Sequence, residues 1–313
     1  MLTHNPDPLT PNAKTSAGGK AHAKLILLGE HFVVPWTDGD GVRHPGTPAI
    51  AVPVPTLRTT VRIEAGTSRE SDPRTRDAIA RAAVLFGWDL AKNPLKVYSE
   101  NGFPLSRGLG SSACFSAALC QAFSELTGNR PELGLRDAAQ SIENIFHGQS
   151  SGLDTAAVLS ENPILFRGQK NVQEFKNVAV DLLILDSGSR QASSSLVSKT
   201  MELRKREPHR WRAYCEQVTA LVQESYQALQ SQDGAAKFAS LVTSNQKILS
   251  DLGLVTTQAE EMLAAGLKLG ALGGKISGAG LGGVLFLATR AGEGQTFADK
   301  VRTSGLEVLA VIS

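Results

Sequence analysis

Short apolar stretches, separated by polar and glycine-rich segments, run along the first hundred residues and predict strands. They lie at residues 23–28, 49–52, 59–64 and 95–99. The stretch 59–64 alternates between apolar and polar side chains, as expected for a strand with one face in the core. Residues 77–86 instead place apolar side chains three and four positions apart, which predicts a helix.

The pattern changes after residue 177. Helical periodicity dominates from there on, at residues 194–206, 210–230, 236–251 and 258–272. Apolar strands accompany these helices at residues 178–185, 284–288 and 306–312. We therefore expect an α+β protein with a flexible tail over residues 1–20, an N-terminal domain over 21–177 and a helix-rich C-terminal domain over 178–313.

A loop of small residues precedes the most apolar helix of the chain. Residues 113–123 are apolar nearly all round, so we expect a helix buried along most of its surface. Before it, Gly108, Gly110 and Ser111 allow a tight turn whose backbone N–H groups converge, and the positive end of the helix dipole reinforces them. This combination favours a phosphate site at a rigid position.

Two other interpretations of this loop are open from its residues alone. Gly108, Gly110 and Ala113 also fit the dinucleotide fingerprint, although that motif follows the first strand of its fold and this loop comes after a hundred residues. A plain glycine turn before a core helix is the simpler alternative. The Gly-Lys-Ser/Thr sequence of a Walker P-loop does not occur in the chain.

Lys24 lies inside the first apolar strand, and Glu30 and His31 follow at its end. A buried ammonium group costs free energy unless an anion lies beside it. Lys24 therefore either has an anionic partner or reaches solvent from an edge strand. Glu30 and His31, beyond the strand, are free to face a cavity.

Two carboxylates follow the apolar helix. Residues 135–146 predict another helix, with Glu143 at the margin of its apolar face. Asp154 comes after a polar turn and before an apolar run, so it is a candidate both for helix capping and for catalysis. Further along, residues 270–283 contain more glycines than a plain turn needs, which lets the backbone approach a ligand or another loop closely.

Composition and charge exclude several classes of protein. The 313 residues are 42% hydrophobic, and the 32 basic and 30 acidic residues are interspersed, so nucleic acid is not an expected partner. The one dense basic cluster is interpreted as a solvated helix face, with a phosphate or partner site as the alternative. It comprises Arg204, Lys205, Arg206, Arg210 and Arg212. No apolar run reaches the roughly 18 residues of a membrane span, so no membrane association is expected.

Cysteine usage indicates the compartment. Cys114, Cys120 and Cys215 cannot all pair and lack the spacing of a metal site. This pattern is typical of a reducing compartment, and residues 1–20 lack the apolar segment of a signal peptide. We expect a cytoplasmic protein.

These separate features match the requirements of phosphoryl transfer. That reaction needs backbone amides for phosphates, a carboxylate and a hydroxyl for Mg²⁺, a positive charge, and a base for the acceptor hydroxyl. Residues 24–31, 104–113 and 275–283 also resemble three signatures of the superfamily that includes galactokinase, homoserine kinase, mevalonate kinase and phosphomevalonate kinase. The resemblance extends from about residue 21 to the end of the chain.

Within that superfamily the details resemble the mevalonate kinases. Galactokinases usually carry Arg where Lys24 stands and follow their Glu-His pair with Thr/Asn-Asp-Tyr, which residues 32–34 do not match. Residues 143–154 and 245–253 are similar to mevalonate kinase segments. The resemblance implies transfer of phosphate from ATP to the primary hydroxyl of mevalonate. A sister kinase acting on phosphomevalonate or another small alcohol, and a non-catalytic nucleotide or isoprenoid sensor, are the alternatives.

The same resemblance implies roles for the candidate residues. Asp154 would take the proton of the acceptor hydroxyl, with Lys24 beside it. Glu143 and Ser112 would coordinate the Mg²⁺ that bridges the ATP phosphates. The triphosphate would be cradled by backbone N–H groups of Arg107, Gly108, Leu109, Gly110, Ser111 and Ser112.

On the acceptor side the resemblance implies roles for Glu30, His31 and Ser193. It also implies a ribosomal protein S5-like N-terminal domain and a ferredoxin-like, helix-rich C-terminal domain, with the active site between them. Residues 278–283 would support the glycine loop from the second domain. A homodimer is expected at the level of the family only.

Several positions depart from the family pattern. Ser150 stands where Pro is usual, and Leu281 interrupts the usual glycine run. Ser194, on the acceptor side, replaces the expected Lys or Arg, and the loop at 35–48 resembles an insertion. These departures concern the choice of acceptor more than the chemistry.

Overall fold

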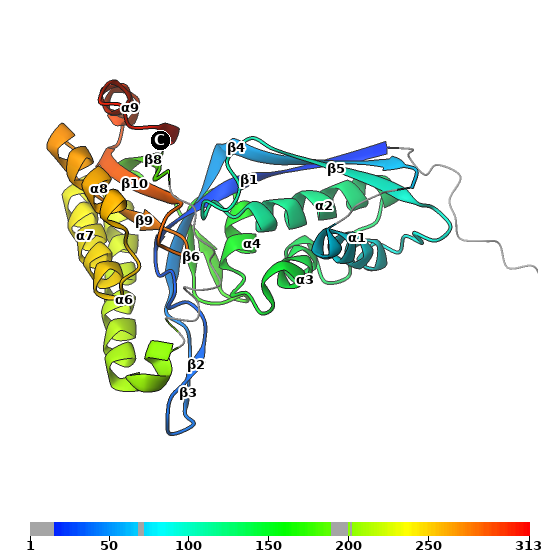
Figure 1. Ribbon diagram of the computed structural model, residues 1–313, viewed down its shortest axis with the longest axis horizontal. Coiled ribbons are helices and arrows are strands. Elements are labelled where there is room, and N and C mark those ends of the chain that lie inside the picture. Colours follow the sequence, from blue (N-terminus) through cyan, green and yellow to red (C-terminus); the bar gives the residue numbers. More distant parts are fainter. Residues whose placement is uncertain (1–15, 68–71, 189–199, 201) are drawn as a thin grey trace, which may run out of the picture.

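The computed structural model describes residues 16–67, 72–188, 200 and 202–313. They form two main sheets, each with its own helices, that lie side by side (Figure 1). All strand pairings in the described part of the chain are antiparallel. The predicted two-domain α+β fold is confirmed. The dinucleotide-binding interpretation of the glycine loop is wrong, because that fold requires a parallel sheet.

The N-terminal sheet has the strand order β1-β4-β6-β7, and β5 pairs with the far half of β4. Its strands are β1 Ser16–Leu28, β4 Ala49–Ala65, β5 Leu95–Asn101, β6 Ile164–Phe166 and β7 Val172–Glu174. Its helices are α1 Pro73–Leu85, α2 Ser111–Thr127, α3 Leu135–His147 and α4 Leu153–Val158. They lie on one side of the long strands, and α2 packs against β1 (Figure 1).

β1 begins earlier than expected. Residues 16–20 pair with residues 60–64 of β4, so the prediction of a tail over residues 1–20 is wrong for 16–20. The glycines here resemble a linker in the sequence, but they have a packing role. A Cβ at Gly19 would lie 1.9 Å from the Ala118 carbonyl oxygen of α2. Glycine therefore lets the strand and helix backbones come into contact.

β4 joins two stretches that were predicted as separate strands, 49–52 and 59–64. Two prolines between them suggest an interruption, because proline cannot donate to a strand ladder. The chain nevertheless passes them within one strand. A shift of register between His22 and Ala23 of β1 accommodates the irregular stretch.

The C-terminal sheet has the strand order β11-β8-β10-β9. Its strands are β8 Val180–Asp186, β9 Gly273–Ser277, β10 Val284–Arg290 and β11 Val308–Ile312. Its helices are α6 Pro208–Leu229, α7 Ala235–Asp251, α8 Thr257–Leu269 and α9 Gly294–Thr303. Helices α6, α7 and α8 stand on the side away from the N-terminal half (Figure 1). We propose the domain boundary at residues 177 and 178, between β7 and β8.

Two elements of this half were missed by sequence reasoning. Residues 273–277 were assigned to a glycine-rich turn but form the buried strand β9. Its glycines are packing residues, since a Cβ at Gly273 would lie 2.7 Å from the Ala239 carbonyl oxygen of α7. The ten-residue α9 was not predicted either. Of the helix predicted at 194–206, residues 200 and 202–206 are helical, and 194–199 and 201 lie outside the described residues.

The expected loop at residues 35–48 contains a small hairpin of β2 Trp36–Thr37 and β3 Arg43–His44, which extends away from both sheets (Figure 1). Asp38 at its turn pairs with Arg212 of α6 at 2.9 Å. The hairpin is thus attached to the C-terminal half. Among the helices that the structure describes, none combines the length and the apolar character that crossing a membrane requires.

Candidate active site

The glycine loop before α2 has the geometry expected of an anion site. Ser106, Gly108 and Gly110 have φ angles of 59°, 81° and 77°, so the chain turns sharply before the helix begins. Gly110 is the N-cap of α2 and provides no side-chain hydrogen bond, and the first turn contains no acidic residue. The first N–H groups of α2 are therefore suited to an external acceptor, and the helix dipole favours an anion there.

Lys24 provides a positive charge at this loop. Its Nζ donates to the Gly108 carbonyl oxygen at 2.9 Å and lies 3.1 Å from Asp154 Oδ1. The Lys24 side chain is 2% exposed, whereas that of Asp154 is 37% exposed. Asp154 is therefore the anionic partner that Lys24 was predicted to need. β1 is an edge strand of its sheet, but the buried Lys24 side chain does not reach solvent, so that alternative is wrong. The carboxylate keeps an accessible side for a substrate.

Asp154 lies in the first turn of α4 and is not its cap. The N-cap is Gly152, with φ 87°, and it makes no side-chain hydrogen bond to the helix. The capping interpretation of Asp154 is therefore wrong.

Ser112 and Glu143 connect the first turn of α2 to α3. Ser112 Oγ donates to Glu143 Oε1 at 2.8 Å, and Ser116 Oγ lies 3.4 Å from Glu143 Oε2. Burial raises the pKa of Glu143 to about 8; the Ser112 hydrogen bond opposes this rise and the charge of Asp154 adds to it. Without a bound cation, the Glu143 carboxyl of the folded protein is thus mostly protonated at neutral pH.

His147, on the last turn of α3, completes this group. Its Nε2 lies 3.0 Å from Ser112 Oγ and 3.5 Å from Glu143 Oε1. Burial lowers the pKa of His147, so the ring is neutral at physiological pH. Sequence reasoning included His147 in a motif without a role. Its position four residues after Glu143 on one helix was the available signal.

Ser112 and Glu143 fit Mg²⁺. A hydroxyl and a carboxylate are the hard oxygen donors that this ion takes, and a cation beside Glu143 would stabilise its ionised form. Within the described ranges, no three His, Cys, Asp or Glu side chains gather into a metal site. Phosphate oxygens and water supply the remaining ligands where Mg²⁺ binds with a nucleotide.

Glu30 is held by a buried lysine that sequence reasoning missed. Lys275 Nζ of β9 donates to Glu30 Oε1, and the two side chains are 0% and 3% exposed. Glu30 Oε2 has no hydrogen-bond partner among the described residues. The argument made for Lys24, that a lysine in an apolar strand needs an anion, applies equally to Lys275. It was not applied because β9 was not recognised as a strand.

His31 follows in a left-handed backbone conformation, with φ 68°. Burial, then the charges of Lys275 and Arg204, lower the pKa of His31 to about 4, so the ring is neutral. Arg204 Nη2 donates to the His31 carbonyl oxygen at 2.8 Å, and its guanidinium lies 4.7 Å from the ring centroid of Trp211. The prediction that the basic cluster forms a solvated face is therefore wrong for Arg204, which turns inward.

The Arg107 side chain connects the two halves. It pairs with Asp186 at the end of β8, with Nε 3.2 Å from Oδ2. Its carbonyl oxygen accepts from Val284 N at 3.1 Å, and a Cβ at Gly278 would lie 2.9 Å from Gly108 Cα. The glycine loop and the second glycine stretch are thus in backbone contact, as expected. Ser193, predicted on the acceptor side, lies outside the described residues.

A polar network fixes α3 against α4. Gln140 Nε2 donates to Asn144 Oδ1 at 2.9 Å and to Ser150 Oγ at 2.6 Å, while Thr155 Oγ1 donates to Gln140 Oε1. Ser150 N also donates to Asn144 Oδ1 at 3.1 Å. Ser150 therefore has hydrogen bonds at a position where the family usually has Pro. Because the two candidate carboxylates lie on these helices, the network fixes their relative positions.

A cavity of about 620 Å³ opens beside the turn before α4. Its lining includes Arg43, Arg167 and Lys170, and no acidic residue among the described ones. Thr47 also lines it, and its buried Oγ1 has no hydrogen-bond partner in the part of the chain that is described. These groups favour an anionic ligand.

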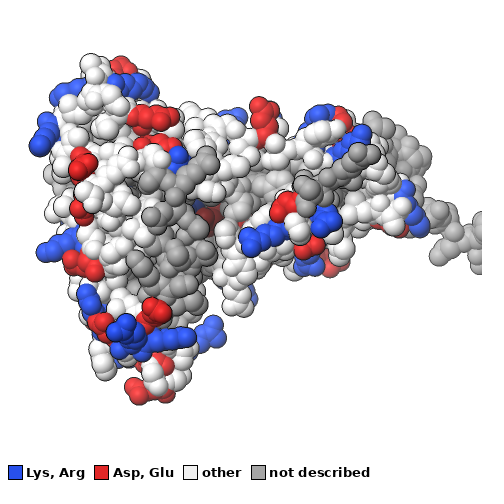
Figure 2. Space-filling view, in the orientation of Figure 1, with Lys and Arg blue, Asp and Glu red and all other residues white. Residues whose placement is uncertain are grey.

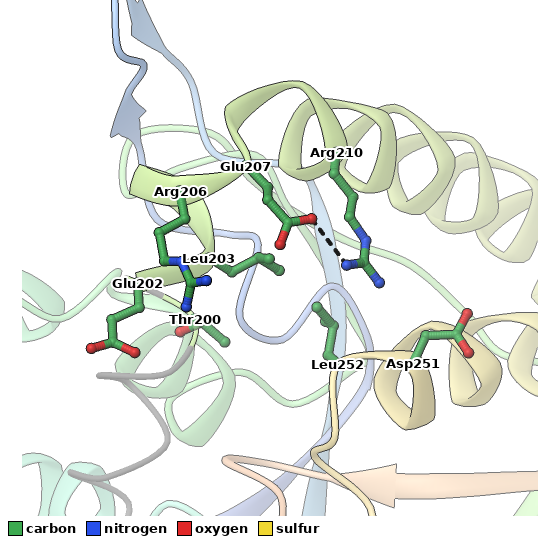
Figure 3. Close-up of a pocket in the computed structure, with 8 residues that line it drawn as sticks. All are labelled: Thr200, Glu202, Leu203, Arg206, Glu207, Arg210, Asp251 and Leu252. Atoms are coloured by element: carbon green, nitrogen blue, oxygen red, sulfur yellow. Dashed lines mark hydrogen bonds and ion pairs between the residues drawn. The ribbon is translucent and has the colours of Figure 1, made fainter.

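A second cavity, of about 200 Å³, lies between residues 200–207, the start of α6 and the end of α7 (Figure 3). Glu207 and Arg210 pair there at 3.0 Å, and the other charged side chains of the lining, those of Glu202, Arg206 and Asp251, are also of both signs. The molecular face in Figure 2 likewise shows Lys and Arg beside Asp and Glu. This mixed charge does not select an anion, and the cavity contains none of the predicted site residues.

Family models match both halves of the chain. The model for the N-terminal domain of GHMP kinases matches residues 77–162, and that for the C-terminal domain of GHMP kinases matches residues 225–306. Together they cover more than half of the 313 residues. This chain belongs to the GHMP kinase family. The resemblance to this superfamily and the assignment as a kinase, both predicted from sequence, are confirmed.

Several GHMP kinases similar to this chain over most of its length are named mevalonate kinase, and solved structures of a phosphomevalonate kinase and a galactokinase have the same fold, with TM-scores of 0.74 and 0.71. A mevalonate kinase from Aeropyrum pernix is 26% identical over 308 residues, covering 90% of each chain. One from Methanothermobacter thermautotrophicus is 29% identical over 285 residues, covering 86% of this chain and 88% of the relative. Among solved structures, L. major mevalonate kinase in complex with R-mevalonate has a TM-score of 0.77 at 21% identity, covering 97% of this chain and 98% of its own. That similarity shows the GHMP kinase fold.

Proposed function

We propose that this protein is an ATP-dependent mevalonate kinase. It transfers the γ-phosphoryl group of ATP to the primary hydroxyl of mevalonate and gives 5-phosphomevalonate and ADP. The observation that carries the proposal is the Lys24–Asp154 pair beside the glycine loop, together with the hydrogen-bonded Ser112 and Glu143 at the first turn of α2. The names of the relatives support mevalonate as the acceptor, since they match this chain along nearly its full length.

Asp154 acts as the general base. Its exposed side accepts the proton of the primary hydroxyl as the oxygen attacks the γ-phosphorus, and the bond from that phosphorus to the ADP oxygen breaks. Lys24 lies 3.1 Å from Asp154 Oδ1 and holds this carboxylate in place through their ion pair. Lys24 also stabilises negative charge that develops on the transferred group.

The triphosphate binds at the N-terminal end of α2, through backbone N–H groups from Arg107 to Ser112. Ser112 and Glu143 would hold Mg²⁺, which would neutralise part of the phosphate charge. His147 keeps the hydroxyl of Ser112 and the carboxylate of Glu143 oriented toward the same point.

Glu30 and His31 are the residues that we place at the acceptor. Ser193, which the family resemblance also assigns to it, lies outside the described residues. Glu30 Oε2 and His31 Nε2 are buried and have no hydrogen-bond partner in the described part of the chain, and we assign the polar contacts with the acceptor to them. The protein works in the cytoplasm on small-molecule substrates, without nucleic acid or membrane partners, and a homodimer is its proposed assembly.

Phosphomevalonate is the second candidate acceptor. The three basic residues around the larger cavity favour it, because phosphomevalonate carries a phosphate in addition to its carboxylate and so has more negative charge for them to balance. Another small alcohol remains an alternative of the same class. A non-catalytic sensor is disfavoured because Lys24, Ser112, Glu143 and Asp154 are assembled in a geometry suited to catalysis.

A panel of acceptors tests the proposal. ADP release by the purified protein is measured with Mg-ATP and mevalonate, phosphomevalonate, homoserine, galactose or no acceptor. Turnover with mevalonate alone is expected. Turnover with phosphomevalonate would transfer the same mechanism to the second candidate. Nucleotide binding without turnover on any acceptor would support the sensor.

A further inference from the structure

We infer that Arg204 binds the carboxylate of the acceptor and fixes its orientation, with the primary hydroxyl at Asp154. This inference rests on the proposed function, because it assigns one end of mevalonate to a residue that no family motif contains. The observation behind it is a half-buried guanidinium that has no anion of its own beside the acceptor segment.

Three cations gather around the end of β1, but they have only two carboxylates. Lys24 pairs with Asp154, and Lys275 pairs with Glu30. Arg204 makes no ion pair with any described Asp or Glu. The undescribed stretch 189–199 contains neither residue type in its sequence. Of these three cations, Arg204 is therefore the one without a carboxylate partner among the described residues, which suits it to bind the carboxylate of an acceptor.

The charges of these cations act on one region. Lys24 contributes to the lowered pKa of Lys275, and Lys275 together with Arg204 lowers the pKa of His31. The thiol of Cys215 also faces Arg204, but burial raises its pKa to about 11, so it carries no negative charge at neutral pH. Arg204 is thus close enough to the acceptor segment to act on a bound anion and has no competing thiolate.

Its orientation is fixed before any ligand binds. The Trp211 ring holds one face of the Arg204 guanidinium, and the His31 carbonyl oxygen holds Nη2. Trp211 itself stacks on Phe32, the residue that follows His31, with the two ring centroids 4.5 Å apart. A pre-oriented guanidinium loses little entropy when it binds a planar carboxylate. Ammonium groups lack this planar, two-pronged geometry.

Mevalonate has its carboxylate and its primary hydroxyl at opposite ends. If the hydroxyl lies at Asp154, the carboxylate lies away from it. We place it at the acceptor segment beside His31 and Arg204, and the larger cavity is the competing location. An acceptor without the carboxylate would then gain nothing from Arg204. This consequence separates a binding role from a structural one.

The test compares two acceptors in two variants. The variants are Arg204→Gln and the matched control Arg206→Gln. Arg206 belongs to the same helical segment but lines the smaller cavity (Figure 3). Both variants are assayed with mevalonate and with 3-methylpentane-1,3,5-triol, which lacks the carboxylate. Arg204→Gln is expected to lower kcat/KM for mevalonate roughly 30- to 100-fold through KM, with KM for ATP unchanged. With the triol, Arg204→Gln and the unchanged protein should agree within about threefold. Arg206→Gln should match the unchanged protein with both.

Other results overturn the inference. An equal loss with both acceptors would make Arg204 a structural residue. A loss specific to mevalonate in Arg167→Gln, with none in Arg204→Gln, would move the carboxylate to the larger cavity. If Arg204→Gln does not fold, Arg204→Lys takes its place. Its kcat/KM should fall for mevalonate more than for the triol, and an equal fall with both acceptors contradicts the inference. Failure of the unchanged protein to phosphorylate mevalonate would overturn the proposed function as well.

Discussion

Lys24 and Asp154 lie 3.1 Å apart, and the same lysine Nζ donates to the Gly108 carbonyl oxygen at 2.9 Å. One side chain of β1 therefore contacts both the first turn of α4 and the glycine loop before α2. The backbone N–H of Lys24 adds a third contact, a hydrogen bond to the Leu109 carbonyl oxygen. The proposed base and the proposed phosphate site are thus positioned by one residue.

Changing Lys24 to Met should reduce catalysis while the fold survives. We expect kcat to fall about 10²- to 10³-fold, because developing charge on the phosphoryl group loses its nearest cation. The measurement is steady-state ADP release, with the melting temperature as a test of folding. Lys20→Met, at an exposed position of the same strand, is the control and should keep full activity. A folded Lys24→Met enzyme with near-normal kcat would contradict the assignment.

Mg²⁺ affinity should rise with pH up to about 9. Glu143 has a pKa of about 8 without the metal, so below that pH the carboxyl must lose a proton before it binds Mg²⁺. The apparent affinity should therefore increase about fivefold between pH 7 and 8, with a steeper rise at lower pH, and level off above about pH 9. The Mg²⁺ dependence of activity at fixed saturating ATP measures it. A profile that is flat across this range would exclude Glu143 as a ligand with this pKa.

Glu143→Gln should stabilise the free protein. The folded carboxyl titrates near pH 8 and the unfolded one near 4.5, so the unfolded chain binds fewer protons between these values and stability falls as pH rises. The neutral amide removes up to about 3 kcal/mol of this cost at pH 7. Denaturant unfolding at pH 5 and pH 7 measures the difference, which should be larger at pH 7. Exposed Glu132→Gln is the control. The same variant should need more Mg²⁺ for activity.

Breaking the Lys275–Glu30 pair should be strongly destabilising. Lys275→Met leaves the buried Glu30 carboxylate without its counter-charge, at an expected cost of about 3–5 kcal/mol in the free energy of unfolding. Adding Glu30→Gln should recover part of that loss, because no buried charge is then left unpaired. Lys247→Met on exposed α7 surface is the control. Additive losses in the double variant would show that the two side chains do not interact.

Lys24 shows how far sequence reasoning could go. A lysine within an apolar strand predicts a nearby anion whatever the fold, and Asp154 was available as a carboxylate with two candidate roles. The α+β class and the buried α2 followed from periodicity in the same way. These are local signals, and the structure confirms them.

Lys275 and Arg204 show where such reasoning stopped. The glycines of β9 serve close packing against α7, yet in the sequence they resemble a turn, so the same lysine argument was not applied to Lys275. Arg204 belongs to a cluster of charges that resembles a solvated face. Its contact with His31 joins residues far apart in the chain, which local patterns do not predict. Gly18 and Gly19 misled in a similar way at the start of β1.

Formation of phosphomevalonate in a single turnover, with and without the Asp154 carboxylate, tests the proposed reaction most directly. The unchanged protein and Asp154→Asn are mixed in excess with Mg-ATP and mevalonate, and the new phosphate ester is followed by ³¹P NMR or mass spectrometry. The unchanged protein should produce a 5-phosphate ester. Folded Asp154→Asn should do so about 10²- to 10⁴-fold more slowly with ATP binding retained. A folded Asp154→Asn protein that forms the ester at the normal rate would contradict a mechanism with Asp154 as the base.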